Sequence, residues 1–335
     1  MRLAAAAGGP YPAIMKARVR IDDEAVAAFA GFFKASDEIV PFDFCSRSEG
    51  FIYPDRGQPG VMEYFFFVCA HQFGFWRLEN DRWTAPMVAR IDGRDWKGSD
   101  YLFRAATRAW QRDPMVFAPD HLHRLEDARI EALFLDDHGR NPLPMWPEHL
   151  AIIRASAAWF AHRRTRPEQL LQTAQAAPKP LRALLDLLAE VPGYAEDPLA
   201  KKAMLLAITL ENRPEKFLSV PDPESAKPII DYHLQRSALR TGLVRVDDEE
   251  LRERLQSRRR VEPREEELIR AATYEAIERL MQQTGLSAAA IDWFFFQNRS
   301  RCPETTQPDC AVCPVRAICA RQTRLFQPVF RTTAY

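Results

Sequence analysis

The chain has 335 residues, of which 27% are charged and 47% hydrophobic, so it is long enough to bury one large core or two ordinary ones. This composition excludes a disordered, collagen-like or coiled-coil protein. Lysine plus arginine and aspartate plus glutamate each total 46, so the formal net charge is zero. No global positive field therefore attracts the chain to duplex nucleic acid.

Signals for membranes and export are weak. The apolar run from Tyr64 to Ala70 is far shorter than the roughly 20 residues that cross a bilayer. The start of the chain breaks at Gly8-Gly9-Pro10 before an apolar core forms, which is typical of a loose tail and not of a signal peptide. We therefore expect a disordered tail over residues 1–15, no membrane partner and a cytoplasmic location.

The predicted elements change character along the chain. Asp22 to Lys34 predicts an amphipathic helix, because its apolar residues recur at helical spacing. Met62 to Trp76 is rich in Phe, Tyr and Val, which favours β structure, and a strand-turn-strand pattern continues to Trp83. The remaining predicted elements are helices over residues 100–112, 120–135, 147–163, 167–173, 180–190, 198–210, 223–241, 247–258, 263–284 and 287–297.

This pattern predicts a mainly α protein. The best boundary lies near Arg163, where mixed α/β sequence gives way to helical sequence. We expect an N-terminal α/β cap that contributes the base pocket over 16–163, a helical domain over 164–300, and a cysteine loop and tail over 301–335.

Four of the six cysteines fall within 18 residues, with the spacing C-x7-C-x2-C-x5-C: Cys302, Cys310, Cys313 and Cys319. Thiols clustered in a reducing compartment indicate a metal and not disulfides. Four-cysteine zinc sites usually pair two C-x2-C knuckles, and this loop has one. We therefore favour a [4Fe–4S] cluster over zinc.

The second motif is Ile230-Asp231-Tyr232-His233-Leu234-Gln235-Arg236, which resembles a segment of a glycosylase superfamily, named below, in which the aspartate opens a helix. An aspartate at a helix start keeps its negative charge near the positive end of the helix dipole. Such a carboxylate can stabilise the positive charge that builds on a sugar when an N-glycosidic bond breaks, and it can activate water. The alternative is an aspartate that only caps a helix.

Both motifs resemble those of the helix-hairpin-helix DNA glycosylases of the endonuclease III and adenine glycosylase branch, C-x6-C-x2-C-x5-C and V-D-T-H-x-x-R. The resemblance implies a helix-hairpin-helix glycosylase-like fold, a structural cluster and a catalytic Asp231. A weaker match pairs Val191-Pro192-Gly193 with Lys201-Lys202-Ala203 but lacks the second hairpin glycine. Close approach to a DNA phosphate is therefore not expected, and both lysines are read as surface or phosphate-contacting residues.

A longer resemblance, over roughly residues 20–300, is to the queuosine salvage family. It rests on Tyr64 to Trp76, Trp96-Lys97-Gly98, Lys201-Lys202-Ala203, Asp231-Tyr232 and Glu266 to Ala272. Members of that family resemble helix-hairpin-helix glycosylases and hydrolyse queuosine 5′-phosphate to release queuine. Gln72, Gly74, His71 and His233 depart from the family pattern, and the family members lack the cysteine loop, so the substrate identity stays open.

The resemblance also implies binding roles. Phe73 and Trp76 would stack the base, and Gln72 and His71 would read its edge. Tyr232 and His233 would flank the catalytic carboxylate, and Lys201 or Lys202 would contact a phosphate. The structural alternative for the aromatic residues is a buried strand, in which alternate members belong to the core.

We therefore expect an N-glycosidase that acts on a modified nucleoside of the 7-deazaguanine type, or on its 5′-phosphate, as a small-molecule substrate. One alternative is a base-excision DNA glycosylase that flips a damaged base from DNA, with or without lyase chemistry through Lys201. Another is a non-enzymatic protein that binds a nucleotide or senses redox state. The sequence carries no signal for the oligomeric state.

Overall fold

The computed structural model describes residues 18–45, 53–328 and 332–335, so the predicted tail over 1–15 lies outside the described residues. Within them the protein is mainly helical, as predicted, with a few short strands. The chain divides into two compact units. Described residues 18–37, 232–285 and 295–328 form the first, and residues 38–45, 53–231, 286–294 and 332–335 form the second. The predicted boundary near Arg163 falls inside the second unit.

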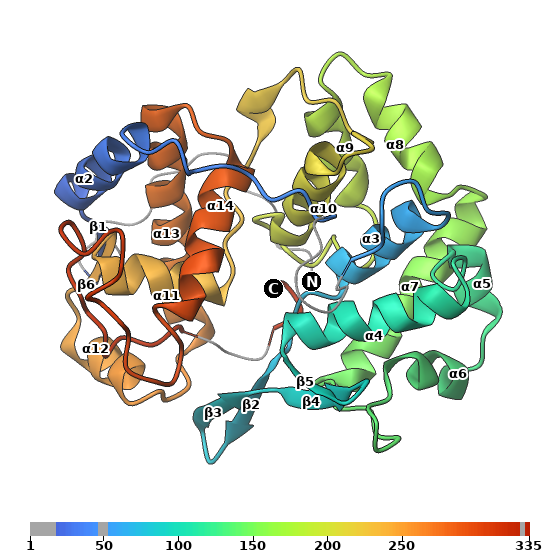
Figure 1. The fold of residues 1–335 in the computed structure, drawn as a ribbon, viewed down its shortest axis with the longest axis horizontal. Helices are drawn as coiled ribbons and strands as arrows, with labels where there is room; N and C mark the ends of the chain where they lie inside the picture. The colour runs from blue at the N-terminus through green and yellow to red at the C-terminus, as the bar shows by residue number, and fades with distance from the viewer. Residues whose placement is uncertain (1–17, 46–52, 329–331) are drawn as a thin grey trace. The chain divides into compact units, whose positions relative to one another are not determined.

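The first unit combines one two-stranded ribbon with helices. Its elements are β1 (Val19–Ile21), α2 (Asp23–Lys34), α11 (Tyr232–Thr241), β6 (Val244–Val246), α12 (Glu249–Gln256), α13 (Pro263–Thr284), the end of α14 (Ala288–Gln297) and η3 (Asn298–Ser300). β1 and β6 pair antiparallel, and α13 runs beside α2 and also contacts α11 (Figure 1).

Local sequence explains where the helices of this unit begin. The Asp22 side chain accepts a hydrogen bond from Ala25 N at 3.0 Å, and the Asp248 side chain accepts one from Leu251 N at 2.8 Å. A capping box joins Glu262 and Glu265 at the start of α13. These bonds satisfy amide groups that have no partner in the first helical turn.

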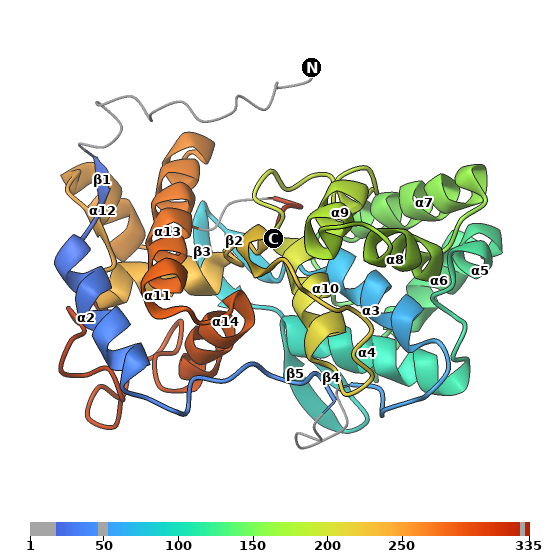
Figure 2. The same cartoon turned by 90° about the horizontal axis from the view of Figure 1, so that it is seen from above.

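The second unit holds the remaining elements: α3 (Val61–Ala70), β2 (Trp76–Glu79), β3 (Arg82–Pro86), β4 (Val88–Ile91), β5 (Arg94–Lys97), α4 (Ser99–Arg112), α5 (Pro119–Arg124), α6 (Asp127–Glu131), η1 (Ala132–Phe134), α7 (Trp146–Arg163), α8 (Pro167–Gln175), α9 (Pro180–Leu188), α10 (Lys201–Asn212), η2 (Pro223–Ser225) and the first part of α14. α3 lies at its centre, in contact with α10, α4 and α8 (Figure 2). β2 and β3 form one antiparallel hairpin, and β4 and β5 form another.

The β prediction for Met62 to Trp76 is wrong over most of its length. Val61–Ala70 is a helix in which every residue is buried, and strand β2 begins only at the last residue of the predicted segment, Trp76. A helix that is apolar all round has no amphipathic period, so its sequence reads like a buried strand. The aromatic run is nevertheless core, as its composition indicates.

Two predicted helices are interrupted. The segment predicted over 120–135 is divided into α5, α6 and η1, and the segment predicted over 223–241 contains an extended stretch between η2 and α11. This second break matters for the site, because it places Asp231 immediately before α11. Among the described residues, no helix has the length and apolar character needed to cross a membrane.

Candidate active site

Two carboxyl groups of the second unit interact with each other. Asp231 is half-buried at the residue before α11, and Asp292 is half-buried on α14. The pKa of Asp292 is raised to about 8, first by desolvation in the surrounding protein and second by the Asp231 charge, while the Lys201 charge opposes the shift. Neighbouring carboxyls do not readily ionise together, which is why a pair of this kind can hold one acid and one base at neutral pH.

Lys201 is positioned by the turn that starts α10. Asp197 accepts hydrogen bonds from Leu199 N at 3.0 Å and from Lys201 N at 2.6 Å, so its carboxylate caps the helix. The Lys201 side chain is 5% exposed, and its ammonium donates to the Gln72 carbonyl oxygen at 3.4 Å. Lys201 is thus hydrogen-bonded just beyond the end of α3, and its positive charge also acts on Asp292.

Lys202 is buried more deeply. Its ammonium donates to the Thr333 carbonyl oxygen at 2.8 Å and lies 3.7 Å from Glu196, and burial lowers its pKa to about 8. The expectation that the two lysines lie on the surface is therefore wrong, because both side chains are enclosed. A buried ammonium needs such partners to offset the loss of water.

The predicted base-contacting residues meet the lysines in the same unit. His71 Nδ1 lies 3.1 Å from His149 Nδ1, and the Phe73 ring stacks on His149 with centroids 4.0 Å apart. Lys202 Nζ lies 5.2 Å from the Phe73 centroid, and Gln72 donates its side-chain amide to the Val68 carbonyl oxygen. The structure thus brings together His71, Gln72, Phe73, Lys201 and Lys202.

The two histidines are held neutral. Burial lowers the pKa of His71 well below its usual value and lowers that of His149 to about 3, with the Lys202 charge acting in the same direction on both. One Nδ1 must then donate and the other accept, so the rings adopt opposite tautomers. Among the described residues, His149 Nε2 is buried without a hydrogen-bond partner.

Trp76, Tyr232 and His233 each have contacts of their own. Trp76 is 5% exposed at the start of β2, where it pairs with Pro86 of β3. Tyr232 and His233 belong to the first unit, with ring centroids 4.2 Å apart. His233 Nδ1 lies 3.0 Å from the Arg236 guanidinium and 3.7 Å from Glu304, so its ring faces groups of its own unit.

Sequence reasoning missed Asp292, His149 and an aromatic stack. Phe42 and Trp293 are half-buried, with ring centroids 4.1 Å apart and an interplanar angle of 17°. No local motif marks any of these residues. Asp292 becomes visible only when α14 is folded beside Asp231, and the sole signal in the sequence is an acidic residue inside an otherwise apolar helix.

The four loop cysteines lie close enough together in the first unit to interact. The other three thiols each raise the pKa of Cys319, after burial, which is the largest cause. Arg240 donates to Cys302 Sγ at 3.3 Å, and Arg321 N donates to Cys319 Sγ at 3.3 Å. Within the described ranges, however, no three His, Cys, Asp or Glu side chains are arranged as a set that could hold a metal ion.

Arginines of α11 hold this loop in place. Arg240 donates to the carbonyl oxygens of Pro303 at 2.7 Å, Leu325 at 2.9 Å and Glu304 at 3.3 Å. Arg236 donates to Gln327 Oε1 at 2.9 Å. The helix that follows Asp231 is thus bonded along its length to the segment that carries the cysteines.

Comparison with known families identifies the chain. The family model for queuosine salvage proteins matches residues 52–318. The chain belongs to the queuosine salvage family. Its role therefore lies in queuosine salvage, which fits a small-molecule nucleotide substrate. A search of the curated proteins finds no match.

The match spans both features of interest in this queuosine salvage protein. It includes Asp231, Asp292 and Lys201, and it ends at the residue before Cys319. The family assignment therefore rests on a region that contains the carboxyl pair and most of the cysteine loop.

Proposed function

We propose that the protein hydrolyses the N-glycosidic bond of queuosine 5′-phosphate, or of a closely related 7-deazaguanine nucleoside, and releases the free base. The observation that carries this proposal is the interacting pair of Asp231 and Asp292 in a member of the queuosine salvage family. Breaking a glycosidic bond requires negative charge near the sugar and a proton for the departing base. In this proposal Asp231 supplies the negative charge and Asp292 supplies the proton.

Asp292 is the proposed acid. Its pKa of about 8 keeps it protonated at neutral pH, so it can donate to the base as the bond from the sugar to the base nitrogen breaks. Asp231 is the proposed catalytic carboxylate, which stabilises the cationic sugar and orients a water. The water oxygen then bonds to the sugar, its displaced proton restores the acid, and the reaction consumes one water.

Lys201 is the better candidate for a phosphate contact. Its ammonium donates one long hydrogen bond, to the Gln72 carbonyl oxygen. The Lys202 ammonium, in contrast, donates to the Thr333 carbonyl oxygen and forms an ion pair with Glu196. An ammonium carries three donors, so Lys201 retains capacity for a phosphate oxygen.

The base-contact roles of His71, Gln72, Phe73, Trp76, Tyr232 and His233 remain predictions. The Phe73 ring is fully buried and stacked on His149, which leaves the half-buried stack of Phe42 and Trp293 as a second aromatic surface for a planar base. Alanine variants of Phe73 and Trp293, compared for KM, distinguish these two surfaces.

For the cysteine loop we propose a [4Fe–4S] cluster held by Cys302, Cys310, Cys313 and Cys319, within a helix-hairpin-helix glycosylase-like fold. Four thiols that interact within one loop support it, as do the arginine and the backbone amide that donate to two of the sulfurs. Because no three of the described side chains are arranged as a set that could hold a metal ion, the loop would have to close around the cluster as it binds. Such a cluster would serve as a structural clasp, and no catalytic step passes through it.

The test is direct. Anaerobically purified protein is mixed with queuosine, with queuosine 5′-phosphate and, separately, with lesion-bearing DNA duplexes, and released bases are identified by mass spectrometry. We expect queuine from the mononucleotide and none with Asp231→Asn. A damaged base released only from duplex DNA would replace this proposal with a repair glycosylase, and tight nucleotide binding without any base release would indicate a binding protein.

A further inference from the structure

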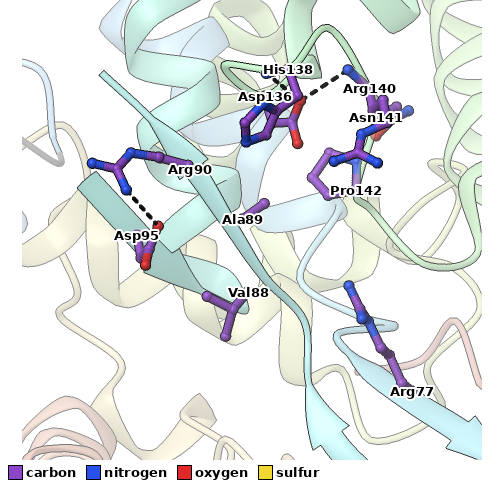
Figure 3. A pocket seen from close by; sticks show the side chains of 10 residues that line it. All are labelled: Arg77, Val88, Ala89, Arg90, Asp95, Asp136, His138, Arg140, Asn141 and Pro142. Atoms are coloured by element: carbon purple, nitrogen blue, oxygen red, sulfur yellow. Dashed lines mark hydrogen bonds and ion pairs between the residues drawn. The ribbon is translucent and has the colours of Figure 1, made fainter. Parts of the chain in front are cut away.

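A second site lies on the two hairpins of the second unit. A pocket of about 590 Å³ opens between β4, β5 and the turn that precedes α7 (Figure 3). The ionisable side chains of its lining are Arg77, Arg90, His138, Arg140, Asp95 and Asp136. None of these residues belongs to the carboxyl pair or its lysines.

The walls of this pocket are fixed to each other. Asp137 N donates to the Arg90 carbonyl oxygen at 2.9 Å, and the Asp137 carboxylate accepts from Asp92 N at 3.0 Å and from Gly93 N at 2.9 Å. The hydrogen bonds from these two backbone N–H groups lower the pKa of Asp137, and the bond from Gly93 is the largest cause. The turn and the hairpin therefore present a preformed surface, which lowers the entropic cost of binding a ligand.

The two carboxylates that line the pocket, Asp95 and Asp136, contact groups of the pocket itself. Asp136 Oδ1 accepts from His138 N and from Arg140 N, each at 2.9 Å (Figure 3). Asp95 Oδ1 lies 4.0 Å from Arg90, whose guanidinium also donates to the Gly93 carbonyl oxygen. Asp136 is thus bonded by the backbone of its own turn, and Asp95 forms a long ion pair with Arg90.

Arg77 and Arg140 are the other two arginines that line the pocket. Within the part of the chain that the structure describes, the side chains of Arg77 and Arg140 form no ion pair and no hydrogen bond. Figure 3 shows them on separate elements around the pocket, with Val88 and Pro142 between the polar groups. Val88 is 47% exposed, so the pocket offers apolar contact surface beside two guanidinium groups that have no ion-pair partner among the described residues.

We propose that this pocket is a second binding site, for a phosphate-bearing ligand of the size of a mononucleotide. Guanidinium groups bind phosphate oxygens through paired, charge-assisted hydrogen bonds, which suits Arg77 and Arg140. The volume lies within the usual range of small-molecule sites. The zero net charge of the chain favours a small ligand over a polyanionic nucleic acid, whose binding depends on many positive contacts.

The test uses adenosine 5′-monophosphate and inorganic phosphate as probes on the full chain carrying Asp231→Asn, in which turnover at the proposed active site is expected to be strongly reduced. Binding is measured by calorimetry, and the bound region is located by amide hydrogen exchange. We expect protection over residues 88–97 and 136–142. We also expect the dissociation constant for the mononucleotide to rise about tenfold or more when Arg77→Ala and Arg140→Ala are combined.

The matched control is Arg82→Ala, because Arg82 is an exposed arginine on the same hairpin as Arg77 but does not line the pocket. It should leave the affinity unchanged. The proposal fails if the double variant binds like the control, or if protection appears only outside the two segments. It also fails if a ten-nucleotide RNA binds through these arginines far more tightly than the mononucleotide, because the site would then serve nucleic acid.

Discussion

Two regions of the protein hold polar side chains in different ways. One is the cysteine loop, and the other is the region where the C-terminal end of α3 meets the start of α10. At α3 and α10, ammonium groups and neutral histidines are enclosed by helices whose apolar residues supply the stability. The loop over 301–328 contains no helix or strand among its described residues, and arginines of α11 bond it in place. The region of α3 and α10 is held by packing, whereas the loop is held by a few hydrogen bonds and, under the proposal above, by a bound cluster.

The largest expected effect is on catalysis. Asp231→Asn should lower turnover by about 10²–10⁴-fold, because it removes the charge opposite the sugar while keeping the side-chain shape. The melting temperature should stay within a few degrees of the parent, since Asp231 is only half-buried. Steady-state assays and calorimetry on the same preparation check both expectations, and full turnover by the variant would remove Asp231 from the mechanism.

The next effect tests the loop. Arg240→Ala leaves the carbonyl oxygens of Pro303, Leu325 and Glu304 without their donor, so we expect a loss of about 2–4 kcal/mol in the free energy of unfolding and a fall in bound iron. The matched control is Arg301→Ala, because Arg301 is an exposed arginine of the same loop. Equal iron content in both variants would show that Arg240 does not hold the loop.

A smaller effect separates backbone strain from contact. Gly242 and Gly285 each follow a helix with positive φ, but a Cβ on Gly242 would lie 2.7 Å from Ala320 Cβ, whereas one on Gly285 meets nothing within 4 Å. Each alanine variant pays about 1 kcal/mol or more for its backbone conformation. Gly242→Ala should lose more stability than Gly285→Ala and should also perturb the loop. Equal losses of unfolding free energy in urea would mean that the loop moves away from the added Cβ at no cost in stability.

The pH dependence of stability tests the raised pKa of Asp292. The folded chain holds the Asp292 proton up to about pH 8, whereas an ordinary aspartate loses it near 3.8, so this group lowers the free energy of unfolding as pH rises between those values. Asp292→Asn removes that loss. Its melting temperature, relative to the parent, should therefore be higher at pH 8 than at pH 5, and a constant difference would contradict the raised pKa.

Local signals explain what could be predicted. The starts of α8, α9 and α13 follow from prolines in their first turns, and the four cysteines stand out because they are close in the sequence. The prediction of Asp231 as the catalytic carboxylate rests on a local signal too, because the residue is part of one short motif. The family role in queuosine salvage also follows from motifs in chain order.

Other features depend on tertiary structure. The apolar run of α3 has no period that distinguishes a helix from a strand, so only its packing decides. Asp292 lies 61 positions after Asp231, and nothing near it in the sequence indicates that the two interact. Burial of the lysines at 201 and 202 is equally invisible, because charged residues are normally exposed.

The most direct test of the central claim is the pH profile of kcat for base release from queuosine 5′-phosphate, measured for the parent and for Asp292→Asn. If Asp292 donates the proton, the parent rate falls as pH rises through about 8, and the variant is slow with no such fall. A parent rate that stays constant from pH 7 to well above 8, or a variant that keeps both the rate and the fall, would contradict the assignment of Asp292 as the acid.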